Sequence, residues 1–519
     1  MIKGFRTTCL GVMAGMVSAW TATAAEVTLQ TTDGSLSLTG ELIEFDGTVF
    51  RIDTLIGTLE IDAASVVCSG DGCPEIEQTT AFTIAVGDGV SNTLLANLLE
   101  EYAFQEELDA EQTIAGGRTT FELGRTGEDA LVNVSVERSD TPQALGRLAS
   151  GAATVALTTR PVSQGEISAF AVAGLPDPSS PDQEKVIALD ALVPITAPGN
   201  RLRAITIEQL ALVAAGRVTN WSELGGANAP IRLVLPAGGT ATFDVLNALV
   251  LAPSRVNVAS QIERVANDDD LADTVARDPN ALGVVSLSAQ RNAQSVPIRR
   301  VCGAIARPSD FSIKAEEYPL TRRVFMYLSG DAVPPRVADV VDFAGSSAAR
   351  DAIQSVGFID QSITSTDLDQ QGVRLAAALI SAPDNATLQA LRDFSTDFID
   401  SERLSTTFRF TTGSANLDNK ALGDIERMAE YLTRGEAADQ DILVVGFTDS
   451  FGRQDLNVIL GQNRADQVLE ALVDAAGGAI SEDRISAQSF GPLAPVGCNE
   501  TSAGRAINRR VEIWLRDRS

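Results

Sequence analysis

The chain has 519 residues, of which 40 are Lys or Arg and 69 are Asp or Glu, so its formal net charge is −29. This acidic excess argues against nucleic acid or anionic lipid as the main partner, because both bind net cationic surfaces. Histidine is absent, which removes Ser-His-Asp and Cys-His catalysis, histidine metal ligands and imidazole acid/base chemistry. We therefore expect a binding protein without a metal or other cofactor rather than an enzyme.

Residues 1–25 have the pattern of an export signal. Lys3 and Arg6 precede an apolar stretch over residues 9–17, and small residues follow it at 21–25. The apolar stretch is too short for a stable membrane span, which needs about 20 residues. Cys9 stands at the start of this stretch, whereas a lipoprotein signal places its cysteine after it. We expect removal of the signal to leave 38 basic and 69 acidic residues, a net charge of −31.

Residues 26–76 are predicted to form a small β module. Apolar and polar residues alternate with the period of two that is typical of strands, and Asp46-Gly47 is a hairpin signal. About 50 residues build only a marginal core. The module is therefore expected to depend on a disulfide or on its neighbour in the chain.

Four cysteines follow the predicted signal. Cys68 and Cys73 stand in the glycine-rich turn Cys-Ser-Gly-Asp-Gly-Cys, which predicts a local disulfide in an exported chain. Two cysteines are too few for a metal site. Cys302 and Cys498 have no local partner, and we expect both to be unpaired and buried.

Predicted strands alternate with predicted helices from residue 77 to 362. The apolar stretch 82–86 predicts a strand, and the leucines within 94–99 lie on one helical face. Thr141-Pro142 is a helix start, with the cap at the threonine, and residues 206–209 form a capping box. This alternation indicates an α/β fold with a mainly parallel sheet.

The order of motifs in this region resembles the phosphate-type periplasmic substrate-binding proteins of ABC importers. The resemblance implies two lobes that close over an anion. The motifs that carry it are residues 192–195, Asn200, residues 205–210, 216–226, 281–285 and 318–322.

Two glycine-containing loops, residues 87–93 and 238–242, precede predicted helices, where backbone N–H groups and the helix dipole favour an anion. Each loop alone is more typical of a plain glycine turn. The candidate anion-binding residues are Ser91, Thr158, Arg160, Gly239 and Thr240.

The candidate anion site departs from the family pattern in three places. Gly238 replaces the first residue of the usual Ser-Gly-Thr. The arginine and aspartate that often precede this loop are missing from residues 233–237. The aspartate of the family's Ala-Asp-(Ile/Phe) strand end falls at Thr154. Because a buried aspartate there would accept a proton from a bound oxyanion, these changes argue against tight phosphate selectivity.

Residues 363–403 are predicted to form a helical acidic linker, and residues 404–519 follow the order β-α-β-α-β-(α)-β. Asp449 lies just past a predicted strand, and Arg464 lies two turns into the next helix. That helix must fold back on the sheet to bury its later apolar residues, which can bring Arg464 beside the strand end. A carboxylate and a guanidinium in one recess suit a zwitterionic ligand. The alternative is a surface salt bridge worth about 0–1 kcal/mol.

The C-terminal motifs resemble the OmpA-like peptidoglycan-binding domain. They are residues 446–449, Asn457, Arg464-Ala465 and residues 508–513. The resemblance implies that Asp449 and Arg464 hold the amino and carboxylate groups of diaminopimelate in the peptide stem. It also implies supporting roles for Thr448, Asn457, Asn508 and Arg509. Phe447 stands where the family often has a histidine that does not clamp the ligand.

The sequence therefore predicts an exported periplasmic protein of a Gram-negative type envelope, associated with the cell wall or outer membrane. Its C-terminal domain is expected to bind peptidoglycan, and its two-lobed central domain to bind phosphate, another small anion or a cell-envelope protein. The alternative is a phosphate- or oxyanion-binding component of an ABC importer. No nucleophile–base pair or metal cluster supports an enzyme.

Overall fold

A computed structural model describes most of the chain after residue 25, and the predicted export signal lies outside the described residues. The described ranges are 26–31, 36–45, 49–70, 72–73, 79–90, 93–330, 333–368, 371–381, 384–410 and 417–518. The chain forms two compact units, Met1–Gln78 and Thr79–Ser519. Within these ranges, no helix combines the length and the apolar character that a bilayer crossing requires.

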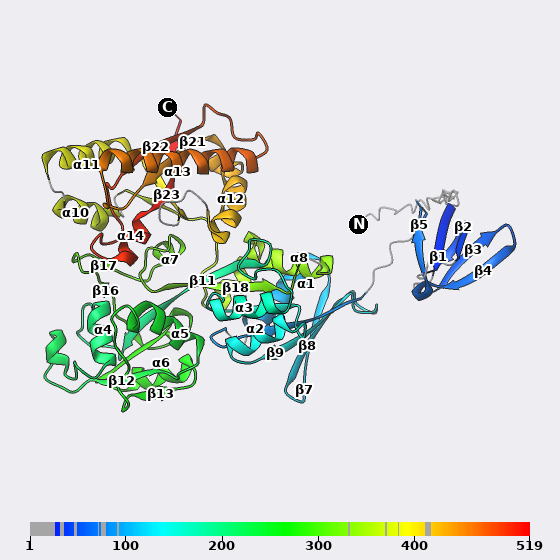
Figure 1. The fold of residues 1–519 in the computed structure, drawn as a ribbon, viewed down its shortest axis with the longest axis horizontal. Coiled ribbons are helices and arrows are strands. Elements are labelled where there is room, and N and C mark those ends of the chain that lie inside the picture. Colours follow the sequence, from blue (N-terminus) through cyan, green and yellow to red (C-terminus); the bar gives the residue numbers. More distant parts are fainter. Residues whose placement is uncertain are drawn as a thin grey trace, which may run out of the picture. The chain divides into compact units, whose positions relative to one another are not determined.

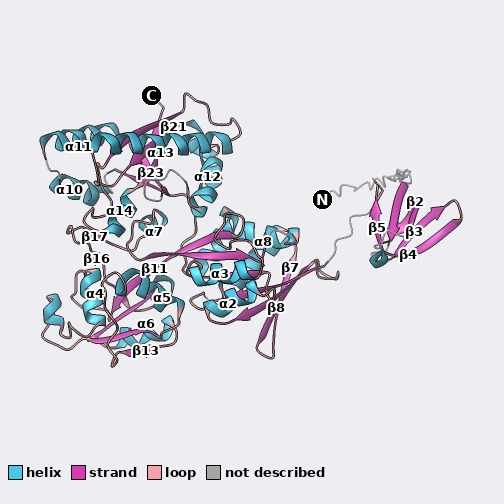
Figure 2. Cartoon of the chain, in the orientation of Figure 1, coloured by secondary structure: helices cyan, strands magenta, loops and turns pink. Residues whose placement is uncertain are grey.

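The first unit is an antiparallel sheet with the strand order β4-β3-β2-β1-β5 (Figures 1 and 2). Its elements are β1 (Glu26–Thr31), β2 (Ser37–Phe45), β3 (Val49–Thr54), β4 (Gly57–Asp62), the 3₁₀ helix η1 (Ala63–Ser65) and β5 (Val66–Ser69). Phe50 and Ile52 are fully buried in a core of five buried apolar side chains. A disulfide joins Cys68 to Cys73, as the sequence predicts. The predicted Asp46-Gly47 turn lies outside the described residues.

The second unit begins with a lobe, called lobe 1 below, whose sheet has the order β11-β18-β10-β6-β9-β8-β7. Its strands are β6 (Thr80–Val86), β7 (Asp109–Ala115), β8 (Arg118–Gly124), β9 (Val132–Arg138), β10 (Val155–Thr158), the first part of β11 (Glu184–Thr196) and β18 (Thr321–Leu328). Its helices are α1 (Leu94–Gln105), α2 (Thr141–Ala149), α3 (Gln164–Val172), α8 (Pro335–Gly345), η5 (Ser347–Ala349) and α9 (Arg350–Ser355).

Lobe 2 continues the same sheet, because β11 passes from one lobe into the other. Glu184–Ala191 pairs with β18, and Leu192–Thr196 pairs with β14. The strands are β12 (Arg232–Pro236), β13 (Glu263–Val265), β14 (Ala281–Ser286), β15 (Gln294–Ser295), β16 (Ile298–Arg299) and β17 (Ile305–Ala306). The helices are α4 (Ile207–Ala214), η2 (Trp221–Leu224), α5 (Ala241–Leu246), η3 (Asn247–Leu251), α6 (Asp268–Arg277), η4 (Leu287–Ala289) and α7 (Asp310–Lys314).

The two-lobed α/β fold is the predicted one, and the capping box at Thr206 is present. Two details differ. The sheet is mixed rather than mainly parallel, because β11 and β18 run antiparallel to their neighbours and β8 runs antiparallel to β7 and β9. The parallel pairs are β6 with β9 and β10 in lobe 1, and β12 with β13 and β14 in lobe 2. The cap of α2 is Asp140 rather than Thr141, because the Asp140 carboxylate accepts the Gln143 N–H at 2.8 Å.

The C-terminal part of the second unit has a five-stranded sheet in the order β19-β20-β23-β21-β22. Its strands are β19 (Ser365–Asp367), β20 (Ser401–Arg409), β21 (Gln440–Phe447), β22 (Ile485–Gly491) and β23 (Arg510–Asp517). Its helices are α10 (Gly372–Ser381), α11 (Asn385–Asp397), α12 (Asn419–Leu432), η7 (Gly435–Asp439), α13 (Gln454–Ala475) and α14 (Ser502–Asn508). From β20 onward the element order is the predicted one.

Residues 363–403, predicted as a helical acidic linker, contain two helices, and both pack on the C-terminal sheet. Phe394 and Phe398 are fully buried and stack with their ring centroids 4.7 Å apart. Both lie edge-on to Trp514 of β23. The segment therefore belongs to the core of the C-terminal domain.

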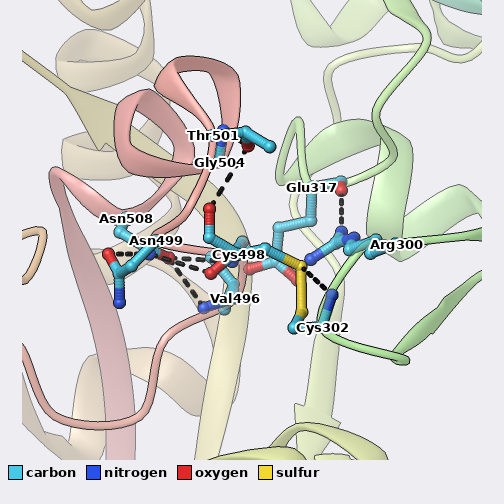
Figure 3. The surroundings of a disulfide bond; sticks show 10 residues. Arg300, Cys302, Glu317, Val496, Cys498, Asn499, Thr501, Gly504 and Asn508 are labelled. Carbon is cyan, nitrogen blue, oxygen red and sulfur yellow. Dashed lines mark hydrogen bonds between the residues drawn. A yellow bond between two sulfur atoms is a disulfide. The ribbon is translucent and has the colours of Figure 1, made fainter. Parts of the chain in front are cut away.

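A second disulfide joins Cys302 of lobe 2 to Cys498 of the C-terminal domain (Figure 3). The expectation that both cysteines are unpaired and buried is therefore wrong. They are 196 residues apart in sequence, and Cys302 is exposed. The pairing forms because the C-terminal domain docks beside the turn between β16 and β17. A local sequence pattern cannot predict such docking.

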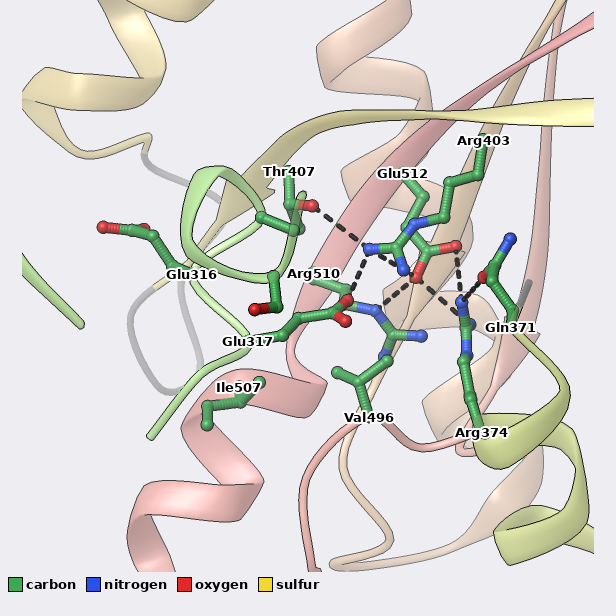
Figure 4. A network of polar contacts seen from close by, with 12 residues as sticks. Glu316, Glu317, Gln371, Arg374, Arg403, Thr407, Val496, Ile507, Arg510 and Glu512 are labelled. Carbon is green, nitrogen blue, oxygen red and sulfur yellow. Dashed lines mark hydrogen bonds and ion pairs between the residues drawn. The ribbon is translucent and has the colours of Figure 1, made fainter. Parts of the chain in front are cut away.

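Buried charges lie at the junction of lobe 2 and the C-terminal domain (Figure 4). Glu512 of β23 is fully buried and accepts the Nε–H of Arg510 at 2.6 Å. Arg374 and Arg403 lie 3.1 and 3.2 Å from the same carboxylate. Arg403 also pairs with Glu317 of lobe 2 at 2.5 Å. Burial alone would raise the pKa of Glu512, but the three guanidiniums outweigh it and hold that pKa well below its usual range.

Glu512→Gln should lower the free energy of unfolding by about 3–5 kcal/mol, because it leaves three buried guanidiniums without their central anion. The depressed pKa of Glu512 contributes stability above the ordinary glutamate pKa of about 4.3, and this contribution is lost as the pH falls further. Urea unfolding between pH 3 and 7 should therefore show that acidification lowers the free energy of unfolding less in the variant than in the wild type. Asp455→Asn, which removes an exposed ion pair with Arg453, is the control and should change the free energy of unfolding little. Equal stability of the two variants would contradict the central role of Glu512.

Candidate functional site

Four of the predicted peptidoglycan-binding residues, Thr448, Asp449, Asn457 and Arg464, lie where α13 crosses the ends of β21 and β22. Two glycines allow this close packing. A Cβ on Gly446 would come within 2.0 Å of the Gly461 carbonyl oxygen, and a Cβ on Gly461 would come within 2.2 Å of Ser489 Oγ. Because Arg464 lies one turn beyond Gly461, the approach brings its guanidinium to the end of β21, where Asp449 follows.

Asp449 and Arg464 line one pocket of about 390 Å³. The other lining residues are Thr448, Phe451, Asn457, Leu460, Ser502, Arg505 and Arg509. The spacing argument that brings the carboxylate and the guanidinium together is thus matched by the geometry. The pocket holds one carboxylate and three guanidiniums, so its formal charge is positive in a strongly acidic protein.

The Asp449 carboxylate is held by the loop that follows it. One oxygen accepts the Phe451 N–H at 2.9 Å, and the other accepts an N–H of Arg509 at 2.9 Å. The Asn457 amide donates to the carbonyl oxygens of Asp449 and Phe451 at 3.3 and 3.1 Å. Asn457 therefore fixes the backbone that presents the carboxylate, as a supporting residue would.

The Arg464 side chain is fully buried, and its guanidinium lies over the Phe410 ring, 5.0 Å from the centroid. Burial lowers the pKa of Arg464 to about 10, with a further lowering by Arg509 and an opposing effect of Asp449. The guanidinium remains protonated at neutral pH. A buried, fixed cation of this kind favours a carboxylate in a bidentate geometry.

Asn508 is fully buried and does not line the pocket. Its Oδ1 accepts the N–H groups of Val496 and Gly497 at 2.9 and 2.8 Å, and its Nδ2 donates to Asn499 Oδ1 at 2.9 Å (Figure 3). Asn499 Oδ1 in turn accepts the Ser450 N–H at 3.2 Å. Asn508 thus ties the loop that carries Cys498 to the Asp449 loop.

Two polar residues of the pocket, Ser502 and Arg505, were not predicted from the sequence. Ser502 and Arg505 lie on α14, and Arg505 donates to the Asn499 carbonyl oxygen at 2.9 Å. The signal was present, since positions 502, 505 and 509 follow one another at helical spacing just before β23. Phe447, at the family's histidine position, points away from the pocket into the core, where the Arg510 guanidinium lies 4.1 Å from its ring centroid.

The candidate anion-binding residues of the central domain mainly contact other groups of the chain. Ser91 lies outside the described residues. Arg160 pairs with Glu166 at 2.8 Å and with Asp244 at 3.5 Å, and Thr158 Oγ1 donates to the Arg160 carbonyl oxygen. Thr240 caps α5 by accepting the Phe243 N–H, and Gly239 takes a positive φ of 86° in the same turn.

The position of Thr154 shows that the missing family aspartate does not bear on the candidate anion site. It directly precedes β10, whereas Thr158 ends that strand, so the two lie about 13 Å apart at 3.3 Å per residue. The turn that contains Asp88 lies at the Thr158 end, since Thr159 Oγ1 contacts the Asp88 carbonyl oxygen at 3.5 Å. A missing aspartate at Thr154 is therefore too distant to bear on the candidate anion site. Among the described residues, no cluster of Cys, Asp and Glu could hold a metal ion.

Family models match both parts of the second unit. Residues 123–348 match the PBP superfamily domain, and residues 409–509 match the OmpA family. These matches confirm the two resemblances that the sequence motifs indicate. Both are families of binding rather than catalytic domains.

Three curated relatives illustrate the matches. The probable lipoprotein YiaD of Escherichia coli is 39% identical over 106 residues, which cover 20% of this chain and 46% of that protein. The peptidoglycan-associated lipoprotein of Legionella pneumophila is 34% identical over 105 residues, which cover 20% of this chain and 57% of that protein. The phosphate-binding protein PstS of Borreliella burgdorferi is 22% identical over 182 residues, covering 34% and 65%. The chain thus spans about half to two thirds of the length of these relatives.

Solved structures match each part separately. An ABC-type phosphate transport receptor from Vibrio cholerae has 19% identity and a TM-score of 0.41, covering 54% of this chain and 99% of that one. The peptidoglycan-associated lipoprotein from Burkholderia pseudomallei has 27% identity and a TM-score of 0.20, covering 21% and 89%.

Asn508→Ala should lower the free energy of unfolding by about 1–3 kcal/mol, because it leaves the buried N–H groups of Val496 and Gly497 without an acceptor. Urea unfolding followed by tryptophan fluorescence measures this loss. Asn385→Ala, at an exposed position on α11, is the control and should change stability little. An Asn508 variant as stable as the wild type would contradict the bracing role.

Proposed function

We propose that this chain, which joins a PBP-superfamily domain to an OmpA-family domain, binds peptidoglycan non-covalently in a Gram-negative type envelope. The observation that carries the proposal is that Asp449 and Arg464 line the same pocket. The proposed ligand is the diaminopimelate residue of the stem peptide, whose free end carries an ammonium group beside a carboxylate.

The pocket offers a partner for each charge of such a ligand. Asp449 would accept the ammonium group, and Arg464 would bind the carboxylate in a bidentate fork. Thr448 adds a buried hydroxyl that has no hydrogen-bond partner among the described residues, so it is available to a ligand. Arg509 would compensate the Asp449 charge and keep its carboxylate oriented, since the two are 2.9 Å apart.

The proposed location is the periplasm, in association with the cell wall or the outer membrane. Relatives of the C-terminal domain are named as outer-membrane or peptidoglycan-associated proteins, which supports a place in the envelope. The export pattern of the first 25 residues agrees with this place. Contact with other envelope proteins through the central domain is part of the same proposal.

A second candidate function is an oxyanion-binding component of an ABC importer. The similarity to the phosphate-binding protein PstS over 182 residues favours it. The paired state of Arg160 argues against it, because that guanidinium already has two carboxylate partners. Neither candidate function involves a catalysed reaction.

Asp449→Ala and Arg464→Ala should each abolish co-sedimentation of the purified protein with peptidoglycan sacculi, because each removes one half of the zwitterion clamp. The measurement compares bound and free protein after centrifugation. Asp455→Ala and Arg434→Ala, which alter exposed charges outside the pocket, are the matched controls and should sediment like the wild type. Normal sedimentation of both pocket variants would refute the proposal.

A further inference from the structure

The proposed functions do not use one carboxylate, Asp88, which lies where lobe 1 meets lobe 2; the boundary formed by Asp88, Thr141 and Ala241 is called the interlobe cleft below. Asp88 lies in the turn Gly87-Asp88-Gly89 after β6, where lobe 1 faces lobe 2. We propose that the Asp88 carboxylate is a built-in anion that fills this cleft and latches the two lobes together, so that the central domain does not take up a free oxyanion.

The Asp88 carboxylate receives hydrogen bonds from both lobes. Oδ1 accepts the N–H of Thr141 at 2.9 Å and its hydroxyl at 3.0 Å, at the first turn of α2 in lobe 1. Oδ2 accepts the N–H of Ala241, the first residue of α5 in lobe 2. A single anion thus bridges two helix starts that belong to different lobes.

The two glycines beside Asp88 show how closely the turn fits between the lobes. A Cβ on Gly87 would come within 2.7 Å of Thr141 Oγ1. A Cβ on Gly89 would come within 2.7 Å of Thr159 Oγ1 and 3.3 Å of the Ala241 Cβ, and Gly89 has a positive φ of 77°. A side chain at either glycine would therefore clash with lobe 1, and one at Gly89 would also crowd Ala241 of lobe 2.

Two guanidiniums near the cleft, those of Arg322 and Arg160, are already paired with carboxylates of the chain. Arg322 is buried and lies 2.7 Å from Asp190, with Thr242 Oγ1 3.4 Å from its Nη1. Arg160 pairs with Glu166 and Asp244. A free oxyanion that enters this cleft would compete with these partners.

Further carboxylates make the cleft unfavourable for an added negative charge. Burial raises the pKa of Asp244, and the nearby charges of Asp88 and Glu166 raise it further against the opposing effect of Arg160. Asp268 is half-buried, and its carboxylate accepts the Thr242 hydroxyl at 2.9 Å and the Ser286 N–H at 3.0 Å. Asp244 and Asp268 both belong to lobe 2, so an incoming phosphate would meet further carboxylates on that side of the turn.

The C-terminal domain holds the lobes from the outside. It contacts lobe 1 through Asp418, which pairs with Arg323 at 2.9 Å, and through Asn419, which donates to the Ser179 carbonyl oxygen at 2.8 Å. It contacts lobe 2 through the Cys498–Cys302 disulfide. A hinge motion that opens the cleft would have to break contacts on one of these sides. The inner latch and the outer contacts thus favour the same closed arrangement.

The first test measures hydrogen exchange of single amides in the full chain. Asp88→Ala should speed exchange by about ten- to hundredfold at both Thr141 and Ala241, because each amide loses a charged acceptor. Asp140→Ala is the matched control, since it removes a carboxylate that caps α2 only, and it should leave Ala241 unchanged. Unchanged exchange at Ala241 in a folded Asp88→Ala variant would overturn the latch.

The second test uses the wild-type chain and does not depend on the variant folding. Calorimetric titration with inorganic phosphate and with sulfate should give no saturable binding heat, because the cleft already holds its anion. Saturable heat with either ion would overturn the proposal. Sacculus binding through Asp449 is measured separately, so failure of the latch and failure of the proposed function are distinguishable.

Discussion

The second unit depends on the buried carboxylate of Glu512. Three guanidiniums surround it, and each comes from a different element: Arg374 from α10, Arg403 from β20 and Arg510 from β23. Removing so many charges from water is costly, and buried ion pairs of this kind seldom add net stability over apolar packing. We interpret the cluster as a device that fixes geometry, since its charges are satisfied only when α10, β20 and β23 are in register and Glu317 of lobe 2 is docked against Arg403.

This charge cluster is continuous with the pocket through a short stretch of chain. Asn508 accepts a backbone N–H of the loop that carries Cys498, and Arg509 pairs with Asp449. Arg510 pairs with Glu512, the carboxylate that also lies beside the other two buried guanidiniums. Four of the five positions from 508 to 512 thus connect the candidate pocket, the Cys498 loop and the core of the C-terminal domain. Since Arg403 extends the cluster to Glu317, the orientation of the pocket is tied to the central domain through side chains that are nearly all buried.

The sequence predicts most of this arrangement where local spacing controls it. Asp449 and Arg464 share a pocket because a strand end and the next helix must pack together, and that follows from apolar periodicity. The pairing of Cys302 with Cys498 could not be predicted, because it depends on how two domains dock. The sequence indicates that the glycine loop at residues 87–93 favours negative charge. It does not show that the charge comes from Asp88 itself, because the N–H groups that bind this carboxylate belong to Thr141 and Ala241, which are distant in sequence.

The order of the cysteines bears on how the chain matures. The four cysteines after the predicted signal are paired in sequence order, the first with the second (Cys68–Cys73) and the third with the fourth (Cys302–Cys498). A chain that emerges N-terminus first into an oxidising compartment would expose its thiols in that same order. Successive oxidation as they appear then gives the native pairs directly, and no shuffling of wrongly joined cysteines is needed. In that order the long cross-link would form last, and its closure would require the C-terminal domain to have docked against lobe 2.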